Sequence, residues 1–542
     1  MSEQKTTIPW RDRIDPVVFS VTGAIAIGFV VWGLISTSSL GSASSSAQDW
    51  VITNTGWFFV LSSSFFVLFV IWLAASKYGR IPLGQDGEEP EFKTVSWIAM
   101  MFSAGMGIGL MFFGVYEPVT HLASPPPFVD AAPNSPDAAN AAMAYTFFHW
   151  GLHPWAIYSV VGLALAYSTY RMGRGNLMSA PFQALLGKER IETKGWGKPI
   201  DILAIICTKF GSATSLGLGA LQIAAGISLL RTGRFADDPG TALPIIIICV
   251  LTVGVVFSAA SGLAKGIKWL SNTNMILSGV LVVFVFVVGP TVFILNLLPS
   301  AVGAYLTDLV PMSFHSAVFG GGDWLASWTI FYWAWWISWT PFVGTFIARI
   351  SRGRTIREFV LGVLLVPTGV SILWFVVFGG AGLNLQLGGV DIAGTGSEAA
   401  GFFAALQNYP FFIGSALVVM VLTAVFFVSG ADAGALVLGT LSSRGRKEPW
   451  KPLVIFWAIL TGAVAAVLLF VGGLGALQTF TILAASPFVL IIIGLCLSLI
   501  VDLRRDPLRQ RTLGPVRTST EVLGTVPFTN RPEDTAPNDT GR

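Results

Sequence analysis

Charged and metal-binding residues are scarce in this chain. Only 11% of its 542 residues are Asp, Glu, Lys or Arg, and it contains four histidines and three cysteines. Such values are far from those of a soluble enzyme. A membrane redox subunit would have haem-spaced His pairs within its spans or clusters of Cys, and the sequence has neither pattern. Cys207, Cys249 and Cys496 have no metal-ligand spacing and are interpreted as small apolar fillers. We therefore expect no enzyme, no cofactor and no covalent chemistry.

Long apolar runs take the place of the missing charge. Hydrophobic residues make up 54% of the chain, and the mean hydropathy is +0.72. About twelve runs are long enough to span a bilayer as helices. They cover residues 16–38, 57–76, 95–118, 142–168, 200–230, 243–262, 269–298, 328–348, 357–380, 411–441, 452–472 and 477–502. The sequence therefore predicts an all-α polytopic protein in a lipid bilayer. Because no small-residue cleavage site follows a short apolar core, the first span is expected to stay in the mature protein.

Basic residues are distributed unevenly between alternate loops. If the N-terminus is cytoplasmic, one set of loops carries nearly all of them, and the opposite loops carry only Arg231 and Arg234. The first set comprises Lys77, Arg80, Lys93, Arg171, Arg174, Lys188, Arg190, Lys194, Lys198, Lys265, Lys268, Arg349, Arg352, Arg354, Arg357, Arg444, Arg446, Lys447 and Lys451. Basic loops favour the cytoplasmic side. The pattern predicts twelve spans in the cell membrane with both termini inside. The net charge of +3 follows from this arrangement and gives no reason to expect nucleic acid as a partner.

The segment 331–339 reads Phe-Tyr-Trp-Ala-Trp-Trp-Ile-Ser-Trp and places four indoles within seven residues. On a helix, Trp335 and Trp336 share a face with Trp339, because they precede it by four and three residues. A desolvated aromatic box suits a quaternary ammonium group, since the ring quadrupoles attract the charge without needing a hydrogen bond. An aromatic belt at the membrane interface is the alternative. A binding site is favoured because polar and helix-breaking residues follow, namely Ser338, Thr340, Pro341 and Gly344.

Two segments that lie five spans apart suggest an internal repeat. The third span contains Ser-Ala-Gly-Met-Gly-Ile-Gly at 103–109, and the eighth contains Ser-Trp-Thr-Pro-Phe-Val-Gly at 338–344. A repeat of five helices must cross the membrane in the opposite direction in its second copy, as in many secondary transporters. Helix breaks at both segments would then line the substrate site and free carbonyl groups for a cation. Gly105 and Gly109 also have the spacing of a helix-packing motif, so both interpretations of the glycine segment stay open.

These motifs together resemble the betaine/choline/carnitine transporter (BCCT) family. The resemblance rests on the glycine break, the Trp-rich run and the basic segment Ala-Arg-Ile-Ser-Arg-Gly-Arg at 348–354, and it covers about residues 12 to 502. It implies twelve transmembrane helices, in which two peripheral helices precede two inverted five-helix repeats of the leucine-transporter type, and it implies a homotrimer. The expected domains are a cytoplasmic N-terminal segment, the peripheral helices with their loop, the first repeat, an extracellular loop with an interfacial helix, the second repeat and a disordered cytoplasmic tail. Their respective ranges are 1–15, 16–94, 95–300, 301–327, 328–503 and 504–542.

The resemblance also implies a substrate site. In that family the aromatic box comes from the fourth and eighth helices and faces the broken third helix. The matching positions here are Trp150, Trp155, Tyr158, Phe331, Trp335, Trp336, Trp339, Gly105, Met106, Gly107 and Gly109. Proton-coupled choline carriers of the family have Asp where this chain has Gly109. A glycine there favours a zwitterion such as glycine betaine, because no buried carboxylate compensates a net positive charge.

Coupling to sodium is implied in the same way. Sodium prefers hard oxygen ligands, and the positions that match the ligands of sodium-coupled relatives are Ser103, Met106, Thr208, Ser212, Phe342, Phe426 and Ser429. One difference is Gly430, where those relatives usually have Ser. We therefore expect a sodium symporter that imports glycine betaine by alternating access. The alternatives are a proton-coupled or exchange carrier for choline, carnitine, ectoine or proline betaine and, from a different class, a channel.

A few polar residues within the spans have more than one interpretation. Asp432 is a costly intramembrane acid whose role is functional or structural. Glu117, at the outer end of the third span, is either a gate residue or an exposed helix end. His149 and His153 are four residues apart, but a metal pair would need further ligands, so we expect hydrogen-bonded interfacial histidines instead.

Overall fold

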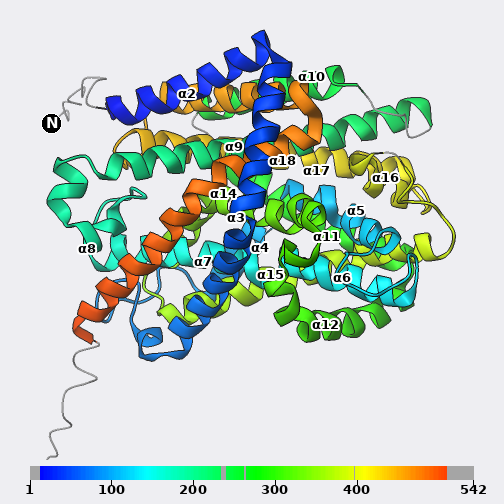
Figure 1. Cartoon of the computed structure of the whole chain (residues 1–542), viewed down its shortest axis with the longest axis horizontal. Helices are drawn as coiled ribbons and strands as arrows, with labels where there is room; N and C mark the ends of the chain where they lie inside the picture. Colours follow the sequence, from blue (N-terminus) through cyan, green and yellow to red (C-terminus); the bar gives the residue numbers. More distant parts are fainter. Residues whose placement is uncertain (1–12, 106, 234–239, 262–263, 396, 509–542) are drawn as a thin grey trace, which may run out of the picture.

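The computed structural model describes residues 13–105, 107–233, 240–261, 264–395 and 397–508. Within these ranges the long elements are all helices, and they form a bundle that α3 and α18 cross obliquely (Figure 1). The α-helices are α2 (Pro16–Ile35), α3 (Thr37–Ala75), α4 (Thr94–Gly105), α5 (Ile108–Ala123), α6 (Pro136–Trp150), α7 (Leu152–Ala166), α8 (Gln183–Leu186), α9 (Gly197–Thr232), α10 (Ala242–Ser261), α11 (Ala264–Val288), α12 (Thr291–Phe314), α13 (Gly322–Leu325), α14 (Phe331–Ile350), α15 (Ile356–Leu387), α16 (Gly401–Leu406), α17 (Phe412–Ser442) and α18 (Lys451–Arg505).

Many of these helices have the length and composition of membrane spans. In the described ranges, eight are long and apolar enough to cross a bilayer: α2, α3, α9, α10, α12, α15, α17 and α18. The prediction of an all-α polytopic membrane protein is therefore confirmed. The number of twelve spans and the inverted repeat stay predictions. The 55-residue α18 contains both of the last two expected spans, which meet at the non-helical residues Gly472 and Gly473.

The expected break in the third span is present. Helix α4 ends at Gly105 and α5 begins at Ile108, and between them Gly107 has an extended backbone with φ of −170° and ψ of −177°. Met106 lies outside the described residues. The first turn of α5 is buried at this break, and Gly107 provides no side-chain cap for its N–H groups, which have no partner within the helix.

The expected break in the eighth span is absent, and this prediction was wrong. Helix α14 runs without interruption through Pro341. Proline has no N–H for the carbonyl of Ile337, but the Thr340 hydroxyl donates to that carbonyl at 2.7 Å. The hydroxyl of Ser338 likewise donates to the Trp335 carbonyl at 2.6 Å. The Thr340 hydroxyl thus satisfies the carbonyl that proline leaves unpaired, so the helix continues and its tryptophans keep helical spacing.

Two other helix boundaries differ from the expected spans. The fourth span is divided at Gly151 into α6 and α7. The seventh ends at Val288, because Gly289 and Pro290 follow, and a separate helix α12 then covers 291–314. The expected domain boundary at 300–301 falls within α12. The range 301–327, where a loop with an interfacial helix is expected, contains the second half of α12, a 3-10 turn at Ala317–Phe319 and the short helix α13.

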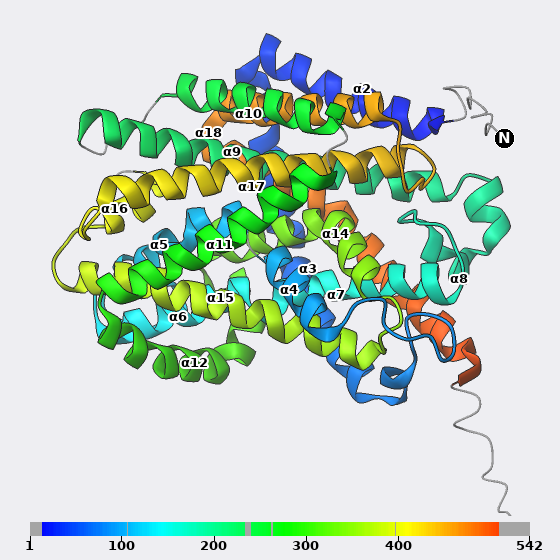
Figure 2. The ribbon, with the colours of Figure 1, turned by 180° about the vertical axis from the view of Figure 1, so that it is seen from behind.

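Polar connections gather at one end of the bundle. The start of α2, the segment around α8 and the end of α18 lie at the same end in both views (Figures 1 and 2). Arg171 and Arg174 join the segment after α7 to the end of α18 through ion pairs with Asp506 and Asp502. Burial by itself would raise the pKa of Asp506, but hydrogen bonds from Arg171 and Tyr167 lower it below its ordinary value. That this end is cytoplasmic stays a prediction.

Candidate functional site

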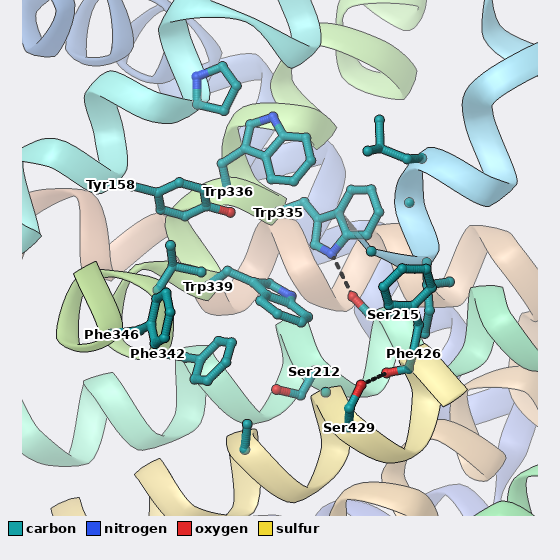
Figure 3. A pocket seen from close by; sticks show the side chains of 18 of the residues that line it. Tyr158, Ser212, Ser215, Trp335, Trp336, Trp339, Phe342, Phe346, Phe426 and Ser429 are labelled. Carbon is teal, nitrogen blue, oxygen red and sulfur yellow. Dashed lines mark hydrogen bonds between the residues drawn. The ribbon is translucent and has the colours of Figure 1, made fainter. Parts of the chain in front are cut away.

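A cavity of about 350 Å³ lies inside the bundle, in the range of small-molecule sites. Its walls come from the start of α5 and from α7, α9, α11, α14, α15 and α17, with Trp150 at the end of α6 (Figure 3). The lining residues are Gly107, Ile108, Gly109, Leu110, Trp150, Pro154, Trp155, Tyr158, Ser212, Ser215, Leu216, Asn274, Met275, Trp335, Trp336, Trp339, Phe342, Val343, Phe346, Ser371, Phe426, Ser429, Gly430, Ala431 and Ala433. None of these side chains carries a charge.

Tryptophan rings form one wall of the cavity. Trp335 and Trp336 stack with their ring centroids 5.0 Å apart. Trp150 meets Trp336 edge-on at 4.9 Å, and Tyr158 meets Trp336 edge-on at 6.3 Å. In Figure 3, Tyr158, Trp336 and Trp339 lie toward one side, and the hydroxyls of Ser212 and Ser429 lie toward the other. The cavity therefore has an aromatic end and a hydroxyl-bearing end.

The orientation of Trp150 depends on Glu117, an acid in α5 that is not among the lining residues. Glu117 is fully buried, so its interpretation as an exposed helix end was wrong. One carboxylate oxygen accepts hydrogen bonds from Trp150 Nε1, at 2.7 Å, and from the Tyr332 hydroxyl. These contacts join α5, α6 and α14 behind the aromatic wall. A carboxylate with several donors can stay buried because its lone pairs are satisfied.

The histidine beside this acid extends the same network. His149 Nδ1 lies 2.7 Å from the second oxygen of Glu117, and its Nε2 lies 3.0 Å from the Thr329 hydroxyl. The backbone carbonyl of His149 accepts from Trp336 Nε1 at 3.0 Å. His153 instead contacts the Ser313 hydroxyl at 3.2 Å. The expectation of hydrogen-bonded histidines is confirmed, although His149 is buried in the protein and its partner is Glu117.

Most of the expected substrate-site residues meet at the cavity. Those that line it are Trp150, Trp155, Tyr158, Trp335, Trp336, Trp339, Gly107 and Gly109. Phe331 does not line it: this ring stacks behind Trp335 at 5.6 Å and supports the wall. Gly105 is the last residue of α4, and Met106 lies outside the described residues. The roles of all these residues in binding stay predictions.

Gly109 occupies a position where no side chain fits. A Cβ atom there would lie 2.6 Å from Trp150 and 2.7 Å from Trp335. The glycine thus lets the backbone of α5 approach the aromatic wall closely. The helix-packing motif of Gly105 and Gly109 is not formed, because the break places the two glycines in different helices, α4 and α5.

Several lining residues were not predicted from the sequence. Ser215 accepts a hydrogen bond from Trp335 Nε1 at 3.2 Å. It follows the predicted Ser212 by three residues, so helical periodicity would have placed it on the same face of α9. Asn274 is buried, and its side-chain amide has no hydrogen-bond partner among the described residues.

The positions expected to hold sodium lie partly at the hydroxyl-bearing end. Ser212, Phe342, Phe426 and Ser429 line the cavity. Thr208 is one helical turn from Ser212 and buried, and its hydroxyl has no partner in the described part of the chain. Such hydroxyls and nearby carbonyls are the hard oxygen donors that sodium prefers, so these residues fit a sodium ion. Ser103 is in α4, but the structure does not describe its side chain.

The contacts of Asp432 in α17 indicate a structural role for this acid. It is buried, and one oxygen accepts a hydrogen bond from the Ser258 hydroxyl of α10 at 3.1 Å. It is not among the residues that line the cavity. The contact ties α17 to α10, as the structural interpretation of this acid requires.

An uncharged aromatic cavity beside a broken helix, in a bundle of membrane-spanning helices, is typical of a carrier for small organic solutes. The sequence profile of the BCCT family, described as betaine/carnitine/choline family transporters, matches residues 17–508. The betaine/ectoine transporter LcoP of Corynebacterium glutamicum is 44% identical over 92% of this chain and 79% of its own length. The glycine betaine transporter OpuD of Bacillus subtilis is 44% identical over 90% of this chain and 94% of its own. Glycine betaine transporter 1 of Vibrio parahaemolyticus is 39% identical over 92% of this chain and 95% of its own length.

This chain belongs to the BCCT family. It is a membrane carrier for quaternary ammonium compounds and not an enzyme. The resemblance that rested on the glycine segment and the Trp-rich run is confirmed.

Proposed function

We propose that this protein imports glycine betaine across the cell membrane by sodium symport. The observation that carries the proposal is an aromatic cavity without a charged lining side chain. Glycine betaine joins a trimethylammonium group to a carboxylate and has no net charge, so an uncharged site needs no counter-ion for it. Relatives named as glycine betaine transporters support the same substrate.

The trimethylammonium group would lie at the aromatic end of the cavity. Each ring of Trp150, Trp336 and Tyr158 that faces the cation would contribute about 0.5–2 kcal/mol, with the larger values in a dry site. Phe331 stacks behind Trp335, and the indoles of Trp150 and Trp336 donate hydrogen bonds to Glu117 and to the His149 carbonyl, so the wall is held in place before substrate arrives. Such preorganisation lowers the entropy cost of binding.

The carboxylate would lie toward the first turn of α5. Gly107 lines the cavity and gives that turn no side-chain cap, so its N–H groups are available to an anion. The Asn274 amide and Trp339 Nε1 lack partners among the described residues and offer further donors. A zwitterion would thus bridge the aromatic wall and the helix terminus.

Sodium would bind at the hydroxyl-bearing end and stabilise the outward-open state for substrate. Thr208 and Ser212 would contribute hydroxyl oxygens from α9, and Phe342, Phe426 and Ser429 would contribute oxygens from α14 and α17. The bound ion supplies positive charge that links these helices to the broken segment between α4 and α5. Alternating access would follow as these groups of helices rock about the occupied site.

Gly109 argues for a zwitterion and against choline. An aspartate at this position would have to displace the indoles of Trp150 and Trp335. Without that carboxylate, the net charge of choline would be buried uncompensated. Ectoine, another zwitterion, is the second candidate because the chain is 44% identical to a betaine/ectoine transporter.

The test is uptake of labelled glycine betaine into proteoliposomes under an inward sodium gradient, with potassium as the control. We expect accumulation that requires sodium and that excess unlabelled ectoine reduces weakly or not at all. Equal uptake with potassium would reject sodium coupling. Absence of glycine betaine uptake, with choline taken up under a proton gradient, would favour the proton-coupled alternative.

A further inference from the structure

Three potential metal ligands meet behind the aromatic wall. The ligand atoms of Glu117, His121 and His149 all lie within 4.8 Å of one another, and the three residues are buried. Glu117 and His121 come from adjacent turns of α5, and His149 comes from α6. Two imidazoles and one carboxylate are the protein ligands of several zinc sites.

His121 is the residue that the hydrogen-bond network leaves unexplained. It is 0% exposed, and neither ring nitrogen has a hydrogen-bond partner among the described residues. Its Nε2 lies 3.7 Å from Glu117 Oε1, which is too long for a hydrogen bond. Two ligand atoms bound tetrahedrally to one zinc ion at 2.0–2.1 Å are about 3.4 Å apart. The spacing therefore fits an ion between the two groups better than it fits a direct contact.

His149 is oriented as a metal-ligating histidine would be. Its Nδ1 faces Glu117 Oε1 at 2.7 Å, and its Nε2 faces the Thr329 hydroxyl at 3.0 Å. When a metal replaces the hydrogen between Nδ1 and Oε1, the Nε2–H group donates to Thr329. Metal-bound histidines characteristically donate their second N–H to such a partner, which fixes the tautomer.

We propose that Glu117, His121 and His149 bind one divalent transition-metal ion of the zinc class, with a solvent oxygen as the fourth ligand. Carboxylate and imidazole ligands select zinc and its neighbours over calcium or magnesium. The rings of Trp328 and Trp324, centred 4.4 and 5.3 Å from the His121 ring, enclose the site and face its residual positive charge. Trp324 belongs to the loop predicted to be extracellular and Trp328 is the first residue of the eighth predicted span, so in this proposal the ion would reach the site from the outer side.

Metal binding inhibits transport in this proposal. The Glu117 carboxylate that receives the ion also holds Trp150 and Tyr332. An ion on its other oxygen joins α5 rigidly to α6 and restrains the aromatic wall during the change of state. The metal site and the substrate cavity are thus coupled through one shared side chain.

The first experiment measures metal binding without substrate. Purified, tag-free protein with a Cys249→Ser background is titrated with Zn²⁺ in competition with a chromophoric chelator, and with Co²⁺ by visible absorption. We expect one tight ion per chain and the absorption bands of tetrahedral Co²⁺. His121→Phe keeps a ring against Trp328 and removes a ligand, so the affinity should fall at least tenfold. His153→Phe, a change of another buried histidine, should leave the affinity unchanged.

Absence of saturable binding in the unmodified chain, or equal affinity in both histidine variants, would overturn the proposal. If His121→Phe unfolds in a thermal-shift control, His121→Asn replaces it with the same expected loss of affinity. A second experiment adds Zn²⁺ outside proteoliposomes and measures glycine betaine uptake. This arm rests on the proposed function, and we expect inhibition that a chelator reverses and that His121→Phe abolishes. If the protein binds the metal but shows no uptake of glycine betaine, the proposed substrate would be rejected and the metal site would remain supported.

Discussion

Glu117 holds Trp150 by a hydrogen bond of 2.7 Å from the indole N–H to the carboxylate, although Glu117 itself does not line the cavity. An acid within the bundle thus fixes a cavity-lining ring that belongs to another helix. The same oxygen binds the Tyr332 hydroxyl, and the other oxygen contacts His149. Because these donors come from α6 and α14, the carboxylate sets how the two helices present their aromatic side chains.

Replacing this acid should weaken substrate binding. In Glu117→Leu, Trp150 Nε1 and the Tyr332 hydroxyl lose a charged acceptor. A hydrogen bond to a charged group contributes about 1.5–3 kcal/mol of free energy. We expect the apparent affinity for glycine betaine to fall by about tenfold or more, measured as the KM of uptake. Glu358→Gln, at the capping box of α15, is the control and should keep the KM. An unchanged KM in Glu117→Leu would mean that Trp150 keeps its position without the acid.

Trp336 should be essential for recognition of the cation. Trp336→Leu keeps an apolar side chain but removes a ring that lies in the cavity between Trp150 and Trp335. Loss of up to about 2 kcal/mol from one cation–π contact corresponds to about 30-fold in affinity. Binding of labelled glycine betaine to purified protein measures the effect, and Trp57→Leu, an exposed position on α3, is the control. Retained binding in Trp336→Leu would place the site elsewhere.

The close approach at Gly109 predicts a steric effect. In Gly109→Ala, the added methyl group would come within 2.7 Å of both Trp150 and Trp335, so the wall must shift. We expect uptake to fall at least tenfold while the protein still folds. Gly28→Ala, where a Cβ meets open space on α2, should transport normally. Equal uptake by the two variants would show that the wall adapts to the methyl group at no functional cost.

Different parts of the site were predictable from the sequence to different degrees. The spacing of Trp335, Trp336 and Trp339 already placed their rings on one face, because a helix has a fixed period. The break at Gly107 followed from local glycine content. The role of Glu117 was harder to predict, because its burial depends on hydrogen-bond donors from two other helices, which no local sequence pattern reveals. The break expected near Pro341 failed because the adjacent threonine replaces the missing backbone donor.

That replacement makes Thr340 a test of helix continuity. In Thr340→Val, the Ile337 carbonyl loses its 2.7 Å hydrogen bond while the side-chain volume stays nearly the same. We expect a loss of about 1 kcal/mol in stability, measured as a lower melting temperature in detergent. In Thr340→Val with Pro341→Ala, the alanine N–H can bond the same carbonyl, so stability should largely return. If Pro341→Ala does not restore stability, the loss of stability in Thr340→Val would come from the changed packing of the side chain and not from the missing hydrogen bond.

Gly430 provides the sharpest test of the sodium proposal. It lies next to Ser429 on α17 and lines the cavity, and a Cβ built there meets open space, so a serine fits without strain. In Gly430→Ser, the additional hydroxyl would supply a hard oxygen near the proposed ion, and we expect half-maximal uptake at a several-fold lower sodium concentration. Gly414→Ser, also in α17 and also facing open space but not among the cavity-lining residues, should leave the sodium dependence unchanged. A sodium dependence that is the same in Gly430→Ser, Gly414→Ser and the unmodified protein would mean that the ion does not bind beside α17, because a new oxygen ligand at the proposed position would alter its affinity.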